Sequence, residues 1–214
     1  MRYSSFGPAL AAALLGGAVF AAAPPAAPPA PAAAPAPAAA AGRHYTLDAA
    51  TSSLQFTFLQ AGAQNSGRFP RFAVALDFPG ADPAGGRLDV MVEVAALDTG
   101  DKDRDDTLKS DDLFAVKKFP QAHFSATQIA RTAAGFEATG NLTIRGVTRA
   151  ASVPFTFREA AEGGATVGYM AGKTVVRRLD YGVGQGEWKA TDQAGNEVTV
   201  SFSLRLTAAT RPGA

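Results

Sequence analysis

Residues 198–207 read Val-Thr-Val-Ser-Phe-Ser-Leu-Arg-Leu-Thr, with an apolar side chain at every second position from Val198 to Leu206. Small or polar residues occupy the positions between them. Successive side chains of a β-strand point to opposite faces, so a period of two is typical of a strand with one buried and one wet face. The stretch therefore predicts a strand that covers an apolar interior.

The same alternation recurs along the chain after residue 44. Turn signals such as Pro79-Gly80 separate the segments, and no strand pattern is followed by a long helical one, which argues against a parallel sheet. Gly140 permits a bend or bulge within its segment. Short strands at such spacings favour an all-β, antiparallel sandwich or barrel of about eight strands. The expected strands cover residues 44–47, 53–58, 72–78, 88–94, 123–129, 135–145, 153–157, one or two segments within 166–181, and 198–206.

One segment, residues 98–118, breaks the alternation. Four aspartates between residues 101 and 106 precede Lys109, an order of charges that suits the dipole of a helix. Pro120 follows and would end the helix. We expect a short helical segment near residues 101–116, lying over the sheet or across one mouth of a barrel.

The first 42 residues differ in composition from the rest. Arg2 precedes an uncharged run rich in Ala, Leu and Gly, which predicts a secretory signal peptide over residues 1–23, with an uncleaved membrane anchor as the alternative. Residues 24–42 are almost entirely alanine and proline, so we expect a disordered linker without a core. The remaining segments are a folded domain at 43–208 and a flexible tail at 209–214.

Charge and composition narrow the classes of function. Of 20 basic and 19 acidic residues, only Arg2 lies within residues 1–42, so the rest of the chain is formally neutral and a poor nucleic-acid binder. The absence of cysteine excludes disulfides, thiol catalysis and thiolate metal sites. The chain has 14 phenylalanines, 4 tyrosines and 1 tryptophan, whereas outer-membrane barrels favour Tyr and Trp in interfacial girdles. These features favour a soluble domain whose interior is either packed or holds one small ligand.

Few residues could carry catalysis or bind a metal. His44 lies at the start of the domain, and His123 is the one candidate for a buried catalytic base. The aspartates from Asp101 onward lack the glycine and glutamate of a calcium loop at its sixth and twelfth positions, which hold Asp106 and Asp112. We therefore predict no metal and no catalytic residue, and keep a lipid-acting enzyme that uses His123 as an alternative.

A series of short motifs runs through the domain in a fixed order. Those in the middle of the chain are the most specific, because several of them lie close together. The motifs are Tyr45-Thr46-Leu47-Asp48, Ser52-Ser53-Leu54-Gln55-Phe56, Gly67-Arg68-Phe69, Asp98-Thr99-Gly100, Arg104-Asp105, Leu108-Lys109-Ser110-Asp111-Asp112-Leu113-Phe114, Phe119-Pro120, Gly140-Asn141-Leu142-Thr143-Ile144-Arg145-Gly146-Val147-Thr148 and Arg178-Leu179-Asp180-Tyr181-Gly182.

On these motifs the chain resembles the YceI-like, polyisoprenoid-binding proteins of bacteria. The resemblance implies a lipocalin-like antiparallel β-barrel, exported to the periplasm, that encloses a long isoprenoid chain and catalyses no reaction. Three positions depart from the family pattern. Thr107 stands where many members have histidine, Tyr181 replaces the usual phenylalanine, and Leu113 replaces a common aromatic residue.

The segment at residues 182–188 is similar to members of the family found beside membrane b-type cytochromes. This similarity suggests a quinone-like ligand and a membrane cytochrome as a partner. Two further alternatives are a lipid-acting enzyme and an interaction module with a fully packed barrel. We expect no cofactor apart from a bound isoprenoid lipid or quinone, and a homodimer is a further candidate assembly.

Two sets of residues are the candidates for ligand binding that the resemblance suggests. Phe114 and Tyr181 are expected at the mouth of the barrel, and charged side chains near the mouth would contact a polar or pyrophosphate head group. The expected wall is Phe58, Phe72, Val92, Phe124, Leu142, Phe155 and Phe202, which together with the two mouth residues makes nine ligand-binding candidates. The head-group candidates are Lys117, Lys118, Arg145, Arg177 and Arg178.

Overall fold

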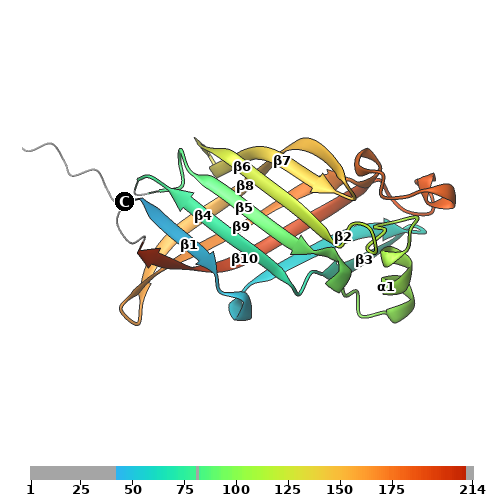
Figure 1. The fold of residues 1–214 in the computed structure, drawn as a ribbon, viewed down its shortest axis with the longest axis horizontal. Coiled ribbons are helices and arrows are strands. Elements are labelled where there is room, and N and C mark those ends of the chain that lie inside the picture. Colours follow the sequence, from blue (N-terminus) through green and yellow to red (C-terminus); the bar gives the residue numbers. More distant parts are fainter. Residues whose placement is uncertain (1–41, 81, 211–214) are drawn as a thin grey trace, which may run out of the picture. The chain divides into compact units, whose positions relative to one another are not determined.

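A computed structural model describes residues 42–80 and 82–210. The described residues form ten β-strands and one short α-helix (Figure 1). The predicted signal peptide and tail lie outside the described residues, except that strand β10 continues to Thr210, and the predicted linker lies outside them up to residue 41. The strands are β1 (Arg43–Leu47), β2 (Ser53–Gln60), β3 (Ala63–Arg68), β4 (Phe72–Phe78), β5 (Arg87–Glu93), β6 (Gln121–Thr132), β7 (Gly135–Ile144), β8 (Val147–Glu162), β9 (Ala165–Arg177) and β10 (Glu197–Thr210).

The strands form one antiparallel sheet that closes into a barrel. The order is β1-β4-β5-β6-β7-β8-β9-β10-β2-β3, and a further pairing of β1 with β10 closes a ring of eight strands. Each strand of the ring from β4 to β10 pairs with its neighbour in sequence, so the ring is an up-and-down meander in which the connection from β5 to β6 contains a helix. The predicted all-β antiparallel barrel of about eight strands is confirmed.

Strand β10 is shared between two partners on the same side. Its second half pairs with β1, with Leu206 opposite Leu47, and its first half pairs with β2, with Phe202 opposite Leu54. The short link between β1 and β2 is fixed to β10, because the Ser52 hydroxyl accepts a hydrogen bond from the Arg205 amide at 2.9 Å. The β2–β3 hairpin therefore extends the wall at one end of the barrel only.

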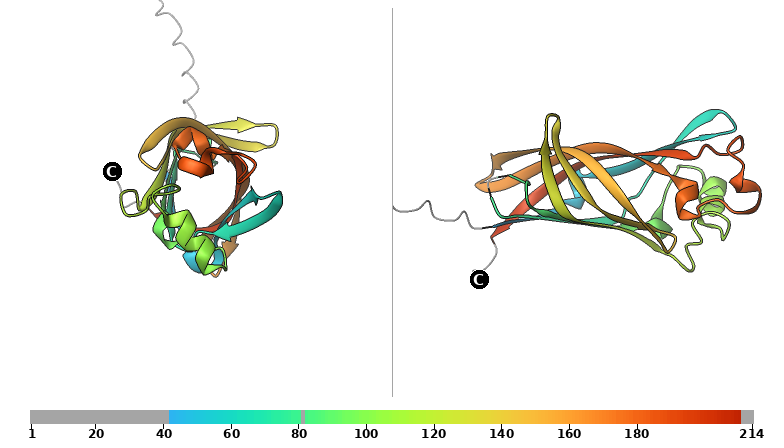
Figure 2. Two further views of the ribbon diagram at one scale, coloured as in Figure 1. Left: turned by 90° about the vertical axis from the view of Figure 1, so that its right-hand side faces the viewer. Right: turned by 90° about the horizontal axis from the view of Figure 1, so that it is seen from above.

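The helix α1 (Lys102–Lys109) stands at that same end of the barrel (Figure 2). The Asp101 side chain caps it by accepting hydrogen bonds from the amides of Asp103 and Arg104. Lys109 lies in its last turn, where a cation complements the helix dipole. The predicted helical segment is confirmed, although the helix is shorter than residues 101–116. Among the described residues, no helix has the length and apolar character to cross a membrane.

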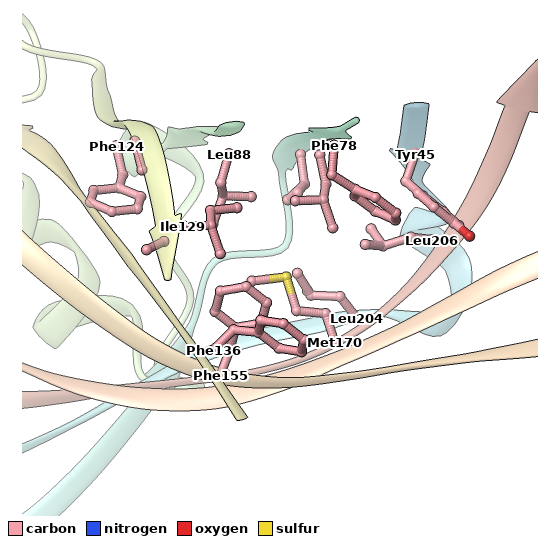
Figure 3. Packing of buried hydrophobic residues seen from close by; sticks show 14 residues of the cluster. Tyr45, Phe78, Leu88, Phe124, Ile129, Phe136, Phe155, Met170, Leu204 and Leu206 are labelled. Atoms are coloured by element: carbon pink, nitrogen blue, oxygen red, sulfur yellow. The ribbon is translucent and has the colours of Figure 1, made fainter. Parts of the chain in front are cut away.

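The opposite end of the barrel is filled by side chains. Figure 3 shows two rows reaching into the interior: Phe124, Leu88, Phe78 and Tyr45 in one row, and Phe136, Phe155, Met170 and Leu204 in the other. All eight side chains are buried, and Tyr45 has no exposed surface.

Glycines and a bulge let the sheet curl around this packed end. The register of β6 against β7 shifts between Ala126 and Gln128, next to Gly140, where an added Cβ would lie 2.2 Å from the Ser125 carbonyl oxygen. The extra residue of the bulge, Thr127, belongs to β6 and lies opposite Gly140, so the irregularity is on the partner strand rather than within the segment of Gly140 itself. At Gly168 a Cβ would meet the ring of Phe157 at 2.7 Å, so only glycine leaves room for that ring.

Candidate ligand cavity

The half of the barrel nearest α1 is hollow. A cavity of about 490 Å³ lies between the inward-facing side chains there. Asp101 and Asp103 are exposed and also border the cavity, so it reaches the molecular surface at the N-terminal end of α1. We call this end the mouth.

Strand β10 shows how the wall of the cavity is made. Val198, Val200, Phe202 and Leu204 line it, all on the inward phase of the strand. The first three remain only half-buried because they face the empty interior, whereas Leu204 is 5% exposed. The Phe202 ring fits over Gly172 of β9, where an added Cβ would approach the ring to 2.6 Å. The alternation that predicts the strand therefore also sets which of its side chains face the cavity.

The inner end of the cavity is a floor of five side chains that belong to both the cavity and the packed core. These side chains come from strands around the ring, and each is at most 6% exposed. The floor consists of Val74, Leu88, Phe124, Met170 and Leu204.

The mouth carries the polar part of the lining. Arg104 and Thr107 face the cavity from α1, and Trp188 borders it from the opposite loop, residues 178–196 (Figure 2). The Arg104 side chain is 27% exposed, and its Nη2 lies 3.8 Å from the carboxylate of Asp101, with which it forms a long ion pair. Its guanidinium therefore has hydrogen-bonding capacity left for a ligand.

Sequence reasoning did not select Arg104 or Thr107 as site residues. A spacing of three places them on one face of a helix, together with the apolar Leu108. That spacing could have indicated the inward face of the helix. The charged residues on all sides of the helix left that face undetermined.

Seven of the nine predicted ligand-binding residues line the cavity. Phe155 does not, because it stacks on Phe136 at 5.6 Å between ring centres inside the packed end. Tyr181 does not either, although it is buried in a small cluster with Leu113 and Val183, both of which line the cavity. The residues that line the cavity are Phe58, Phe72, Val92, Phe114, Phe124, Leu142 and Phe202.

Of the five predicted head-group residues, only Arg178 borders the cavity. Lys117, Lys118 and Arg177 are exposed residues outside the lining. Arg145 is occupied in joining two loops, because its Nη1 donates to the Gly182 carbonyl at 2.7 Å and its Nη2 to the Asp111 carbonyl at 2.6 Å. It ties the segment after α1 to the loop of residues 178–196.

Arg178 is a buried cation whose hydrogen bonds go to backbone carbonyls. Its Nε donates to Gly195 at 2.9 Å, its Nη1 to Val183 at 2.9 Å and its Nη2 to Ala194 at 2.6 Å. Burial lowers the pKa of this guanidinium from its ordinary value. Gly184 is required beside it, because a Cβ there would lie 2.0 Å from Nη1 and the backbone has φ +118°. Arg178 therefore holds the loop in place over the barrel.

The histidines lie away from the cavity. His123, which only the alternative of a lipid-acting enzyme needs as a buried base, is a surface residue, since its side chain is 39% exposed and pairs with Asp89 at 2.8 Å. Neither His123 nor His44, which pairs with Asp77, borders the cavity. In the part of the chain that the structure describes, no group of three or more His, Asp or Glu residues is arranged to hold a metal ion.

Comparison with solved structures gives close matches to the barrel. BcnA of Burkholderia cenocepacia is 32% identical with a TM-score of 0.67, over 74% of this chain and 98% of that one. A polyisoprenoid-binding domain from Saccharophagus degradans, implicated in plant cell wall breakdown, has a TM-score of 0.58 at 16% identity, over 77% and 98% of the two chains. The second likeness shows a shared fold.

Comparison of sequences gives the family. A UPF0312 protein of Yersinia enterocolitica is 32% identical over 108 residues, and one of Photorhabdus laumondii is 35% identical over 83 residues. These matches cover 50% and 39% of this chain and 53% and 43% of the relatives, so the chain spans about half the length of the curated relatives or less. The YceI-like domain pattern matches residues 45–206, which is the whole barrel apart from its ends. The chain belongs to the family of YceI-like domains.

Proposed function

We propose that the protein is a periplasmic carrier that binds a long-chain isoprenoid lipid, a polyprenyl or quinone-like molecule, without transforming it. The observation that carries the proposal is the apolar cavity of about 490 Å³, which lies in the usual size range of ligand pockets. Membership of the YceI-like family supports a lipid-binding barrel. The ligand class named for the Saccharophagus domain is one that such a wall accepts.

Burial of the isoprenoid chain would supply the binding energy. Apolar surface removed from water contributes about 25 cal/mol per Å², so enclosing a few hundred Å² of chain gives several kcal/mol before ordering costs. Val92, Val200 and Phe202 stay half-buried without a ligand, so the protein's own apolar surface would be covered as well.

The mouth favours a head group with neutral oxygen acceptors. Arg104 and Thr107 can donate hydrogen bonds, while the carboxylates of Asp101 and Asp103 border the same opening. These two carboxylates would repel a pyrophosphate, and the lysines expected to neutralise one, Lys117 and Lys118, lie outside the lining. A quinone or phenol head meets the donors without that repulsion.

The proposal of export is based on the sequence at the N-terminus, and the proposal of a periplasmic location is based on the family resemblance. Fractionation of the bacterial cell with the full chain tests both. The expected homodimer and the membrane cytochrome partner stay predictions. Pull-down from membrane fractions would separate a free carrier from a protein that hands quinone to a cytochrome.

The test of binding is organic extraction of the full chain purified from a bacterial host, followed by mass spectrometry of the extract. We expect an isoprenoid lipid at close to one molecule per protein. Val200→Trp should remove it, because Val200 lines the cavity and the larger ring would occupy the ligand's volume.

The matched control is Val175→Trp on the outer face of β9, where the native side chain is 56% exposed. This variant should keep the lipid. A lipid-free extract from folded wild-type protein that also fails to take up added prenylquinone would overturn the proposal. Equal lipid in both tryptophan variants would show that the lipid sits elsewhere.

A further inference from the structure

We infer that the packed end of the barrel measures the length of the bound chain, with Met170 as the residue that sets the limit. The inference rests on the proposed function, since it concerns the ligand of the same cavity. It starts from the position of the floor, which lies partway along the barrel rather than at its far end.

Strand β10 gives the position of that floor. The inward residues from Val198 to Leu204 line the cavity, a span of about 20 Å along a strand. The next inward residue, Leu206, is fully buried in the packed core and does not border the cavity. A chain that enters at the mouth therefore meets protein before it has passed the whole strand.

The core behind the floor leaves no path for a longer chain. Phe136 and Phe155 stack there at 5.6 Å between ring centres. Farther on, Tyr45, Phe78 and Phe157 form a cluster of three rings with centres 5.5–5.7 Å apart. The Tyr45 hydroxyl donates to Glu159 at 2.7 Å, which anchors the cluster at the far end.

Met170 is the part of the floor best placed to set its depth. It borders the cavity on one side and belongs to the packed core on the other, at 2% exposure. Figure 3 shows its side chain between the Phe136–Phe155 pair and Leu204. Methionine is unbranched and adapts to irregular gaps, so its side chain fills the space that the Phe136–Phe155 pair and Leu204 leave in the floor. Truncation of Met170 to alanine would add the volume of the removed side chain to the cavity.

The experiment titrates delipidated protein with benzoquinones that carry side chains of one to ten isoprene units. Quenching of Trp188, the one tryptophan of the chain and a cavity residue, reports binding. In the wild type we expect affinity to rise with length, by about fourfold for each further methylene-sized group buried, and then to reach a plateau. In Met170→Ala the plateau should move to a longer chain by at least one isoprene unit.

A second variant tests the inference from the other side. Val200→Phe adds a ring inside the open part of the cavity, so the plateau should move to shorter chains without truncation of the core. Leu206→Ala is the matched control, because it also truncates a buried core residue but does not border the cavity. Its plateau should equal that of the wild type.

The outcomes separate the two proposals. Absence of binding at every chain length in the wild type would overturn the proposed function. Binding that rises without a plateau, or a plateau unmoved in both Met170→Ala and Val200→Phe, would overturn the length limit while leaving the carrier intact. Should Met170→Ala fail to fold, the shift in Val200→Phe decides the question alone.

Discussion

The two ends of this barrel are built from the same strands with the same alternation, yet one end is solid and the other is hollow. On β10, Leu206 has no exposed surface and Val200 remains half-buried at the edge of the cavity. The difference lies in the size and number of side chains at each level rather than in the pattern. The solid end holds the fold together, which leaves the hollow end free to expose an apolar wall.

The largest expected effect tests this division directly. Phe155→Ala should lower the free energy of unfolding by about 3–5 kcal/mol, because its ring is stacked and enclosed in the solid end. Phe202→Ala should cost clearly less, because that ring already borders an empty space. Urea denaturation of both variants in delipidated protein measures the difference. Equal losses would mean that the hollow end contributes to stability as much as the solid one.

The ring of the barrel could be predicted from the sequence, and this comparison shows why. Strand β3, with the sequence Ala-Gln-Asn-Ser-Gly-Arg, could not be predicted because it lacks the apolar alternation. Alternation records which side of a strand faces inward, so it identifies Val198, Val200 and Phe202 as interior residues. It carries no information about how far each side chain reaches across the barrel. Whether the interior is filled depends on which residues oppose one another, and that follows from the register of strands far apart in the chain.

The candidate site could be predicted only in part, for the same reason. Phe155 and Phe202 have the same residue type and phase, but Phe155 faces Phe136 and Phe202 faces the cavity. The roles of charged residues could be predicted even less well. Arg145 and Arg178 look like free cations in the sequence, whereas their guanidinium groups are hydrogen-bonded to loop carbonyls.

The second prediction concerns the loop that borders the hollow end. Arg178→Met should lower the free energy of unfolding by about 2–4 kcal/mol, because several carbonyls that Arg178 now satisfies would stay buried without a donor. Arg178→Lys should restore little of it, since one ammonium cannot reproduce the planar fork of donors. Hydrogen exchange of residues 182–196 should rise in both variants. A local increase with an unchanged solid end would show that the loop is held separately.

The third prediction places a pH-sensitive group at the solid end. Burial raises the pKa of Tyr45 to about 12 from its ordinary value of 10.0. The unfolded chain then loses this proton at lower pH than the folded protein does. The contribution of Tyr45 to the free energy of unfolding is therefore fully present below pH 10 and is lost as pH rises towards about 12. At roughly 1.4 kcal/mol per pKa unit, the loss is of the order of 3 kcal/mol.

Tyr45→Phe isolates this contribution, because it removes the titrating hydroxyl and keeps the ring. The variant should show a flatter decline of unfolding free energy over the same alkaline range. The control is Tyr169→Phe, which removes a phenol hydroxyl elsewhere on the same barrel. A decline of equal steepness in Tyr45→Phe and the wild type would contradict the assignment.

The smallest expected effect lies at the mouth of the hollow end. Arg104→Ala should weaken the binding of a prenylquinone by about five- to tenfold, because it removes a charged donor that is partly screened by solvent. Lys102→Ala is the control on the same helix, since that side chain is 85% exposed. Neither change should alter the plateau in chain length, because the floor lies at the other end of the cavity.

If Arg104→Ala left affinity unchanged for the quinone, the head group would have to be held by Thr107 or by the facing loop. Because the chain and the head contact opposite ends of one cavity, independent effects of Arg104 and Met170 would show that each end recognises its own part of the ligand.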